Sequence, residues 1–397
     1  MSNTSARMQR EIAPMMHDNP FSDAEIARRL GAFRAELNAR KLDGAVVAAP
    51  ENVFYLTGLD HWGYFAPHLL IVPLQGTPVL VTRAMERVSV EKQVRAAEFR
   101  GHSDSETAAD MAARVVRDLK LNGRRVGLEY WTSGLSHGLA LALKAQADAD
   151  WHDISDLVDG LRLVKSVEEQ ALMRKAAAVT DAAAGATIDA IGDKVPEREV
   201  VAACVAAMTR AGGSPPAFGP FIRPGSRLGE EHTTWGDGHY KSGEPVFLEL
   251  SGCMSRYHAP LGRLVHIGSD SDADAKMAET TKRAFDAVLG ALRPGAKARQ
   301  VYAAWQQVVD DAGLRHYRRH HCGYCVGIGL SPSWTGGNKV VGLRHDSDME
   351  IRDGMSFHVL SWLMGTGRGD YFISNAVLLG AQGPEVLTRT PTGPIVR

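Results

Sequence analysis

The spacing of apolar residues in the first part of the chain predicts alternating helices and strands. Residues 23–37 carry apolar side chains at helical spacing, and the apolar run 44–49 that follows is predicted to be a strand. Two further runs, 68–73 and 77–82, flank a glycine turn and predict a hairpin, and another strand is predicted at 125–129. This order of helices and strands predicts a compact domain with a mixed sheet.

The pattern changes in the second part of the chain. Ser166 and Glu169 have the spacing of a capping box, in which each side chain accepts a hydrogen bond from a free backbone N–H at the start of a helix. A long alanine-rich helix is predicted to follow. Strands are predicted around Phe247 and Leu264, and a further helix is predicted over residues 275–292.

These patterns divide the chain into three parts. A polar arm covers residues 1–20, an amino-terminal domain covers 21–162, and a second domain covers 163–397. The expected fold class is α/β (α+β), because both domains combine helices with strands.

The charge of the chain argues against nucleic-acid binding. The 397 residues include 45 Lys plus Arg against 46 Asp plus Glu, a net charge of -1, whereas nucleic-acid binders carry a basic face. We therefore expect no nucleic-acid partner.

No apolar run approaches the roughly 20 residues that span a bilayer, and the first residues lack the apolar core of a signal peptide, so we expect no membrane partner and a cytoplasmic location. The four cysteines are too few for a disulfide framework, and we expect reduced thiols.

The predicted central strands carry a motif that resembles a known family. Residues 247–263 resemble the paired-strand motif of the pita-bread superfamily, which includes methionine aminopeptidase, aminopeptidase P and creatinase. His232 lies 17 positions before Glu249, as the substrate-facing histidine does in that superfamily. Residues 323–327 and 353–358 resemble two further segments of the same fold. The resemblance implies a creatinase-type amino-terminal domain with a mixed sheet, followed by a pita-bread catalytic domain.

The resemblance also bears on metal binding. Peptidases of this superfamily hold two metal ions with two Asp, one His and two Glu. In this sequence those positions are occupied by Glu249, Pro260, Tyr324, Leu360 and Asn375. Proline and leucine have no side-chain donor, and tyrosine and asparagine are poor substitutes, so we expect no metal and no other cofactor.

Two metal-free branches of the superfamily remain for comparison. Creatinase is similar at His232 and at Arg344, which stands at the place of its carboxylate-binding arginine, but its two active-site glutamates fall on Gly262 and Leu360. The ectoine hydrolase branch resembles residues 247–263 nearly position for position. That branch is therefore the closer resemblance.

The resemblance implies a small zwitterionic substrate, a cyclic amidine that carries a carboxylate. Glu249 is the candidate nucleophile, because a carboxylate pairs with an amidinium cation and can attack its electrophilic carbon. His232 is the candidate acid and base, and Arg344 is the candidate that grips the substrate carboxylate. Further candidates for the pocket lining are Tyr257, His258, Tyr324, His358 and Trp235. Trp62 or Tyr64 is expected to reach in from a second subunit, as in creatinase-type homodimers.

Each candidate also has a structural interpretation. Glu249 could form an ion pair with Arg256 or Arg263, and Arg344 could be a solvated loop charge. His232 could be an ordinary polar residue, and the tryptophans could belong to an aromatic core.

Other functions stay open at this point. Cys322 and Cys325 have the C-x-x-C spacing of redox and zinc sites, although ligands so close in sequence wrap one ion poorly. Asn375 stands where the ectoine hydrolase branch is expected to keep an acid, which leaves the substrate open. The alternatives are a hydrolase or lyase acting on another compatible solute or a guanidino compound, and a non-catalytic pita-bread binding module.

Overall fold

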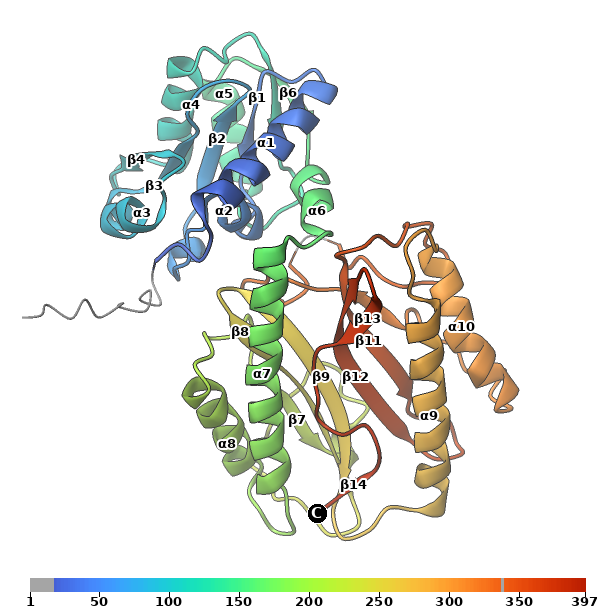
Figure 1. Cartoon of the computed structure of the whole chain (residues 1–397). Helices are drawn as coiled ribbons and strands as arrows, with labels where there is room; N and C mark the ends of the chain where they lie inside the picture. Colours follow the sequence, from blue (N-terminus) through green and yellow to red (C-terminus); the bar gives the residue numbers. More distant parts are fainter. Residues whose placement is uncertain (1–17, 337–338) are drawn as a thin grey trace, which may run out of the picture. The chain divides into compact units, whose positions relative to one another are not determined.

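A computed structural model describes residues 18–336 and 339–397, which form two compact units that divide between Leu157 and Val158 (Figure 1). The arm predicted over residues 1–20 lies, up to residue 17, outside the described residues. Within the described part of the chain, no helix is long and apolar enough to cross a membrane.

The first unit contains a six-stranded mixed sheet with the strand order β4-β3-β2-β1-β5-β6. Its strands are β1 (Gly44–Val47), β2 (Leu69–Pro73), β3 (Val79–Arg83), β4 (Glu98–His102), β5 (Arg125–Leu128) and β6 (Asp150–Asp153). Its helices are α1 (Asp23–Ala39), α2 (Pro50–Thr57), η1 (Gly63–Phe65), η2 (Ala84–Glu86), α3 (Arg87–Gln93), α4 (Ala108–Asp118) and α5 (His137–Gln146). The predicted hairpin is confirmed, because β2 and β3 pair antiparallel. Helix α6 (Leu157–Arg162) spans the division between the units.

The second unit is built on a larger sheet with the strand order β10-β11-β12-β9-β8-β7. Its strands are β7 (Phe221–Pro224), β8 (Pro245–Met254), β9 (Tyr257–His266), β10 (Gly323–Cys325), β11 (Ser356–Leu363), β12 (Tyr371–Gly380), β13 (Gly383–Val386) and β14 (Ile395–Val396). Its helices are α7 (Val167–Ala190), α8 (Glu197–Arg210), η3 (Gly225–Arg227), α9 (Asp272–Ala291) and α10 (Ala298–Asp311). The predicted capping box is present at the start of α7, where Ser166 and Glu169 each bond to the other's backbone N–H.

The helices of the second unit pack on one face of this sheet (Figure 1). Helix α7 contacts β8 and β9, where Thr180 donates a hydrogen bond to the carbonyl of Ala259. Helix α9 contacts β11 and β12, where Ser361 donates to the carbonyl of Thr281. Because successive strand residues point to opposite faces, the residues that alternate with the helix-facing positions project from the other face. That other face carries the candidate site.

Candidate active site

One register row on the face opposite the helices brings five strands together. Phe221 of β7 pairs with Glu249 of β8, Glu249 with Gly262 of β9, and Gly262 with Ser374 of β12, which pairs with Leu360 of β11. Directly paired residues project to the same side of a sheet. Of the five residues in this row, Glu249 alone carries an ionisable side chain. Glu249, the predicted nucleophile, is paired with Phe221 on one side and Gly262 on the other.

Aromatic rings surround this row. The ring of Trp334 lies 4.0 Å from that of Phe218, 6.1 Å from that of Phe221 and 6.3 Å from that of His358, measured between ring centroids. Trp334 is buried, whereas Phe218 and Phe221 are half-buried. Such an arrangement excludes much of the water around Glu249, whose side chain is 15% exposed.

Burial changes the acidity of Glu249. Desolvation raises the pKa of its carboxyl group from 4.5 to about 7, with the nearby charge of Glu231 adding to the increase. The guanidinium groups of Arg223 and Arg319 act in the opposite direction. The carboxyl group therefore gains and loses its proton near neutral pH, as catalytic carboxyl groups often do.

A chain of hydrogen bonds fixes His358 beside Glu249. The indole N–H of Trp334 donates to the hydroxyl of Tyr324 at 3.1 Å, and that hydroxyl lies 2.8 Å from Nδ1 of His358. Indole can only donate, so the Tyr324 hydroxyl accepts from Trp334 and keeps its own proton for another acceptor. In the tautomer in which Nδ1 of His358 takes that proton as acceptor, Nε2–H of His358 donates to the hydroxyl of Ser374 at 2.7 Å. Burial lowers the pKa of His358 to about 3. His358 is therefore a neutral imidazole, 3.8 Å from the Glu249 carboxylate.

His232 lies in an exposed loop beside the aromatic edge of the site. Its ring centroid is 5.8 Å from that of Phe221, the cross-strand partner of Glu249. Its φ of 58° is in the left-handed region that residues other than glycine rarely adopt. The loop must therefore be held by other contacts.

Arg223, which sequence reasoning missed, supplies those contacts. Its guanidinium donates to the carbonyls of Arg227, Leu228 and Thr233, at 3.1, 3.4 and 3.2 Å, and it lies 4.2 Å above the ring centroid of Phe247. These bonds tie both sides of the His232 loop to strand β7. No spacing in the sequence indicates which carbonyls a buried arginine will bind.

Two predicted pocket residues have their polar atoms engaged elsewhere. The hydroxyl of Tyr257 donates to Glu169 at 2.8 Å. Nδ1 of His258 donates to the carbonyl of Arg256, and its Nε2 accepts the N–H of Ala217, both at 2.9 Å. The geometry corrects the expectation for Tyr257 and His258, which position neighbouring segments because their polar atoms are already bonded.

Arg344 also differs from its predicted role. Its exposed guanidinium binds both carboxylate oxygens of Asp346, at 2.9 and 2.8 Å. The solvated ion pair that sequence analysis left as an alternative is therefore formed. The predicted pairing of Glu249 with Arg256 or Arg263 is absent among the described residues, because Arg263 projects toward the helix-covered face and Glu249 does not.

The remaining aromatic candidates lie on exposed segments. Trp235 is 43% exposed and follows the His232 loop. Trp62 is 55% exposed in the first unit, next to Tyr64, whose hydroxyl donates to the carbonyl of Leu59. Both residues of the first unit remain candidates for contacts with a second subunit.

Two protein-family models match this chain. The profile of the creatinase/prolidase N-terminal domain matches residues 29–164, and that of metallopeptidase family M24 matches residues 171–381. The chain belongs to metallopeptidase family M24. The predicted membership of the pita-bread superfamily, and the predicted order of its two domains, are thereby confirmed, and the chain is a member of a hydrolase family.

The relatives of this M24 protein include proteins named for different hydrolase activities. It is 28% identical to an uncharacterised hydrolase/peptidase of Sinorhizobium fredii, over 95% of this chain and 98% of that protein. It is 25% identical to the ectoine hydrolase of Halomonas elongata, over 94% of this chain and 97% of that protein. The structure of the Xaa-Pro dipeptidase from Bacillus anthracis superposes with a TM-score of 0.83 at 21% identity, over 94% of this chain and 100% of that chain. This last likeness concerns the fold.

The family description implies metal ions, but the residues of this M24 protein do not fit a dinuclear site. Pro260 and Leu360 offer no donor atom, and the hydroxyl of Tyr324 is engaged with His358. Asn375 pairs with Val359 on the helix-facing side of the sheet, where its Oδ1 accepts hydrogen bonds from Arg263 and Thr388. Among the described residues, no group of three or more His, Cys, Asp or Glu could hold a metal ion.

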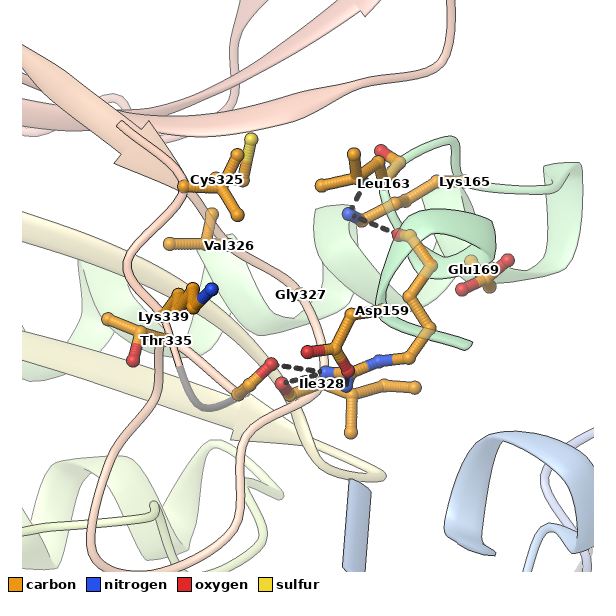
Figure 2. A pocket seen from close by; sticks show the side chains of 13 residues that line it. Asp159, Leu163, Lys165, Glu169, Cys325, Val326, Gly327, Ile328, Thr335 and Lys339 are labelled. Atoms are coloured by element: carbon orange, nitrogen blue, oxygen red, sulfur yellow. Dashed lines mark hydrogen bonds and ion pairs between the residues drawn. The ribbon is translucent and has the colours of Figure 1, made fainter. Parts of the chain in front are cut away.

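A small cavity lies beside Cys325 of strand β10 (Figure 2). It has a volume of about 40 Å³ and is lined in part by Lys165 and Cys325. Lys165 donates to the carbonyls of Arg162 and Leu163, and burial lowers its pKa to about 8. Cys325 alternates with Tyr324 along β10 and therefore faces this cavity and not Glu249.

The environments of Cys322 and Cys325 do not favour redox chemistry or metal binding. Both cysteines are buried free thiols. Burial raises the pKa of Cys325 to about 11 and that of Cys322 further above its usual value. Because the thiolate is the form that binds zinc and attacks disulfides, these environments disfavour both roles.

Proposed function

We propose that this protein is a metal-independent hydrolase that opens a carbon–nitrogen bond in a small zwitterionic solute, ectoine or a close relative. The observation that carries the proposal is the position of Glu249, a carboxyl group among aromatic rings in a site where the described residues form no metal-ligand set. The relationship to an ectoine hydrolase over nearly the full length of both chains supports the same conclusion.

The surroundings of Glu249 suit an amidinium cation. Its carboxylate supplies the opposite charge, and the faces of Phe221 and Trp334 attract cations through their π electrons. In a water-poor site the carboxylate is also a stronger nucleophile, since it has lost part of its hydration.

The reaction proceeds in two steps in this proposal. A Glu249 oxygen forms a bond to the amidine carbon, and one ring carbon–nitrogen bond breaks as protonated His232 gives its proton to the leaving nitrogen. Water then attacks the same carbon, His232 takes up the water proton, and the bond to Glu249 breaks. The net reaction adds one water to ectoine and yields an acetylated diaminobutyrate.

We propose that the active form is a homodimer. Trp62 and Phe65 are 55% and 81% exposed on the first unit, and large exposed apolar side chains mark interaction sites. In this arrangement Trp62 of the partner subunit closes the site over the substrate. Size-exclusion chromatography with light scattering tests the dimer, and Trp62→Ala tests the contribution to KM.

Glu249→Gln and His232→Ala test the chemistry. Both variants are expected to lose turnover of ectoine, measured by mass spectrometry, while their circular dichroism spectra stay unchanged. Glu385→Gln serves as the matched control, since Glu385 forms an exposed ion pair with Arg174 and the change removes one carboxylate away from the site. Full activity in both Glu249→Gln and His232→Ala refutes the assignment.

A further inference from the structure

A second arginine lies beside the site. The guanidinium carbon of Arg319 is 4.8 Å from the ring centroid of Trp362 on β11. The Trp362 ring packs at 4.8 Å against Phe372, which stacks at 5.3 Å on Phe247. Phe247 and Glu249 are two positions apart on β8 and share a face. The cation and the carboxylate therefore flank one aromatic surface.

Among the residues that the structure describes, no carboxylate pairs with Arg319. Within residues 18–336 and 339–397, no acidic side chain lies within ion-pair distance of its guanidinium, which is half-buried. The neighbouring Arg318 binds Asp310, and Arg344 binds Asp346. The donors of Arg223 are used by backbone carbonyls. Arg319 thus retains the donors of a planar guanidinium, which match the two oxygens of a carboxylate.

We infer that Arg319 binds the carboxylate of the substrate and makes this site selective for zwitterions, an inference that rests on the proposed function. The role replaces the one that the sequence suggested for Arg344. A zwitterion places its amidinium against Glu249 and its carboxylate against Arg319, so each charged group of the protein receives an opposite charge. A neutral or cationic analogue leaves Arg319 uncompensated.

Arg319→Gln tests the inference, with Arg344→Gln as the matched control. Steady-state kinetics with ectoine and with its carboxamide analogue separate the charge interaction from general damage. We expect Arg319→Gln to raise KM for ectoine by about ten- to a hundredfold, since a charge-assisted bond is lost, with kcat changed less than threefold. The carboxamide should react equally with the wild-type and Arg319→Gln proteins, and Arg344→Gln should resemble the wild type.

The outcomes separate this inference from the proposed function. If the wild type turns over ectoine and Arg319→Gln leaves KM unchanged, or if Arg344→Gln alone raises it, the role of Arg319 is overturned and the proposed function stands. Isothermal titration of ectoine into Glu249→Gln measures binding without turnover. Absence of ectoine binding by both the wild type and Glu249→Gln overturns both conclusions. Arg319→Lys is expected to recover part of the affinity, because it keeps the charge and loses the planar pair of donors.

Discussion

The hydroxyl of Tyr324 lies 2.8 Å from Nδ1 of His358, and this contact holds the imidazole beside Glu249. The same hydroxyl accepts the indole N–H of Trp334, so Tyr324 joins two buried polar groups of the site. Burial keeps His358 a neutral imidazole, and its Nε2 lies 2.7 Å from the hydroxyl of Ser374. It forms part of the wall beside Glu249, with Nδ1 3.8 Å from the Glu249 carboxylate.

Tyr324→Phe tests this arrangement. The change leaves the Trp334 N–H and Nδ1 of His358 buried without partners, so the free energy of unfolding should fall by about 1–3 kcal/mol. Urea denaturation measures the loss. Tyr371→Phe is the control, because its hydroxyl makes one bond of 3.3 Å to the carbonyl of Thr392. An equal or smaller loss in Tyr324→Phe than in the control contradicts the hydrogen-bond chain.

The acidity of Glu249 predicts the pH dependence of activity. A nucleophilic carboxylate must be ionised, and burial raises the pKa of Glu249 to about 7. The value of kcat/KM should therefore rise between pH 6 and 8 with a midpoint near 7. A rate constant that is flat from pH 5 to 8 contradicts a buried Glu249 nucleophile.

The same shift predicts how stability depends on pH. The folded-state pKa of Glu249 is above its ordinary value of 4.5, so the contribution to stability is fully present below pH 4.5 and is lost as the pH rises through about 7. The shift corresponds to about 3 kcal/mol. Glu249→Gln should lack this loss and be more stable than the wild type at pH 8, but not at pH 4. Thermal unfolding at both pH values measures the difference, and parallel behaviour of the two proteins speaks against it.

Arg223 is predicted to act on both candidate catalytic residues. Arg223→Met removes the bonds to the His232 loop and a charge that lowers the pKa of Glu249, so the acid limb of kcat/KM should move to higher pH and turnover should fall. We expect a stability loss of about 2–4 kcal/mol. Arg223→Lys keeps the charge, and its acid limb should stay near that of the wild type.

Arg198→Met is the control for Arg223→Met, because Arg198 forms an exposed ion pair with Asp237. The pH profile of Arg198→Met should match that of the wild type. If the acid limb of Arg223→Met also stays in place, Arg223 has no influence on the charge of Glu249.

Much of the fold could be predicted because the signals are local. The capping box at Ser166 and Glu169 and the hairpin over 68–82 each depend on residues close in sequence. Glu249 could be found because the strand motif around it resembles that of a known family. The face on which Asn375 projects could not be predicted, because it depends on strand register. Neighbouring residues of a strand point to opposite faces, so Ser374 lies in the site and Asn375 lies among the helices.

The hydrogen-bond and aromatic partners of the site residues could not be predicted from the sequence either. His258 was expected to face the substrate, but the N–H of Ala217, 41 positions away, occupies its ring nitrogen. Arg319 stood in a basic run with no sign of its contact with Trp362. Such contacts depend on which distant segments the sheet brings together, and hydrophobic periodicity does not encode them.

The most direct test of the central claim is ectoine turnover by the wild-type protein after dialysis against EDTA, followed by mass spectrometry and combined with metal analysis. We predict that ectoine is converted to an acetylated diaminobutyrate at the same rate before and after metal removal. No conversion, or a conversion that EDTA abolishes and a divalent metal restores, contradicts the claim.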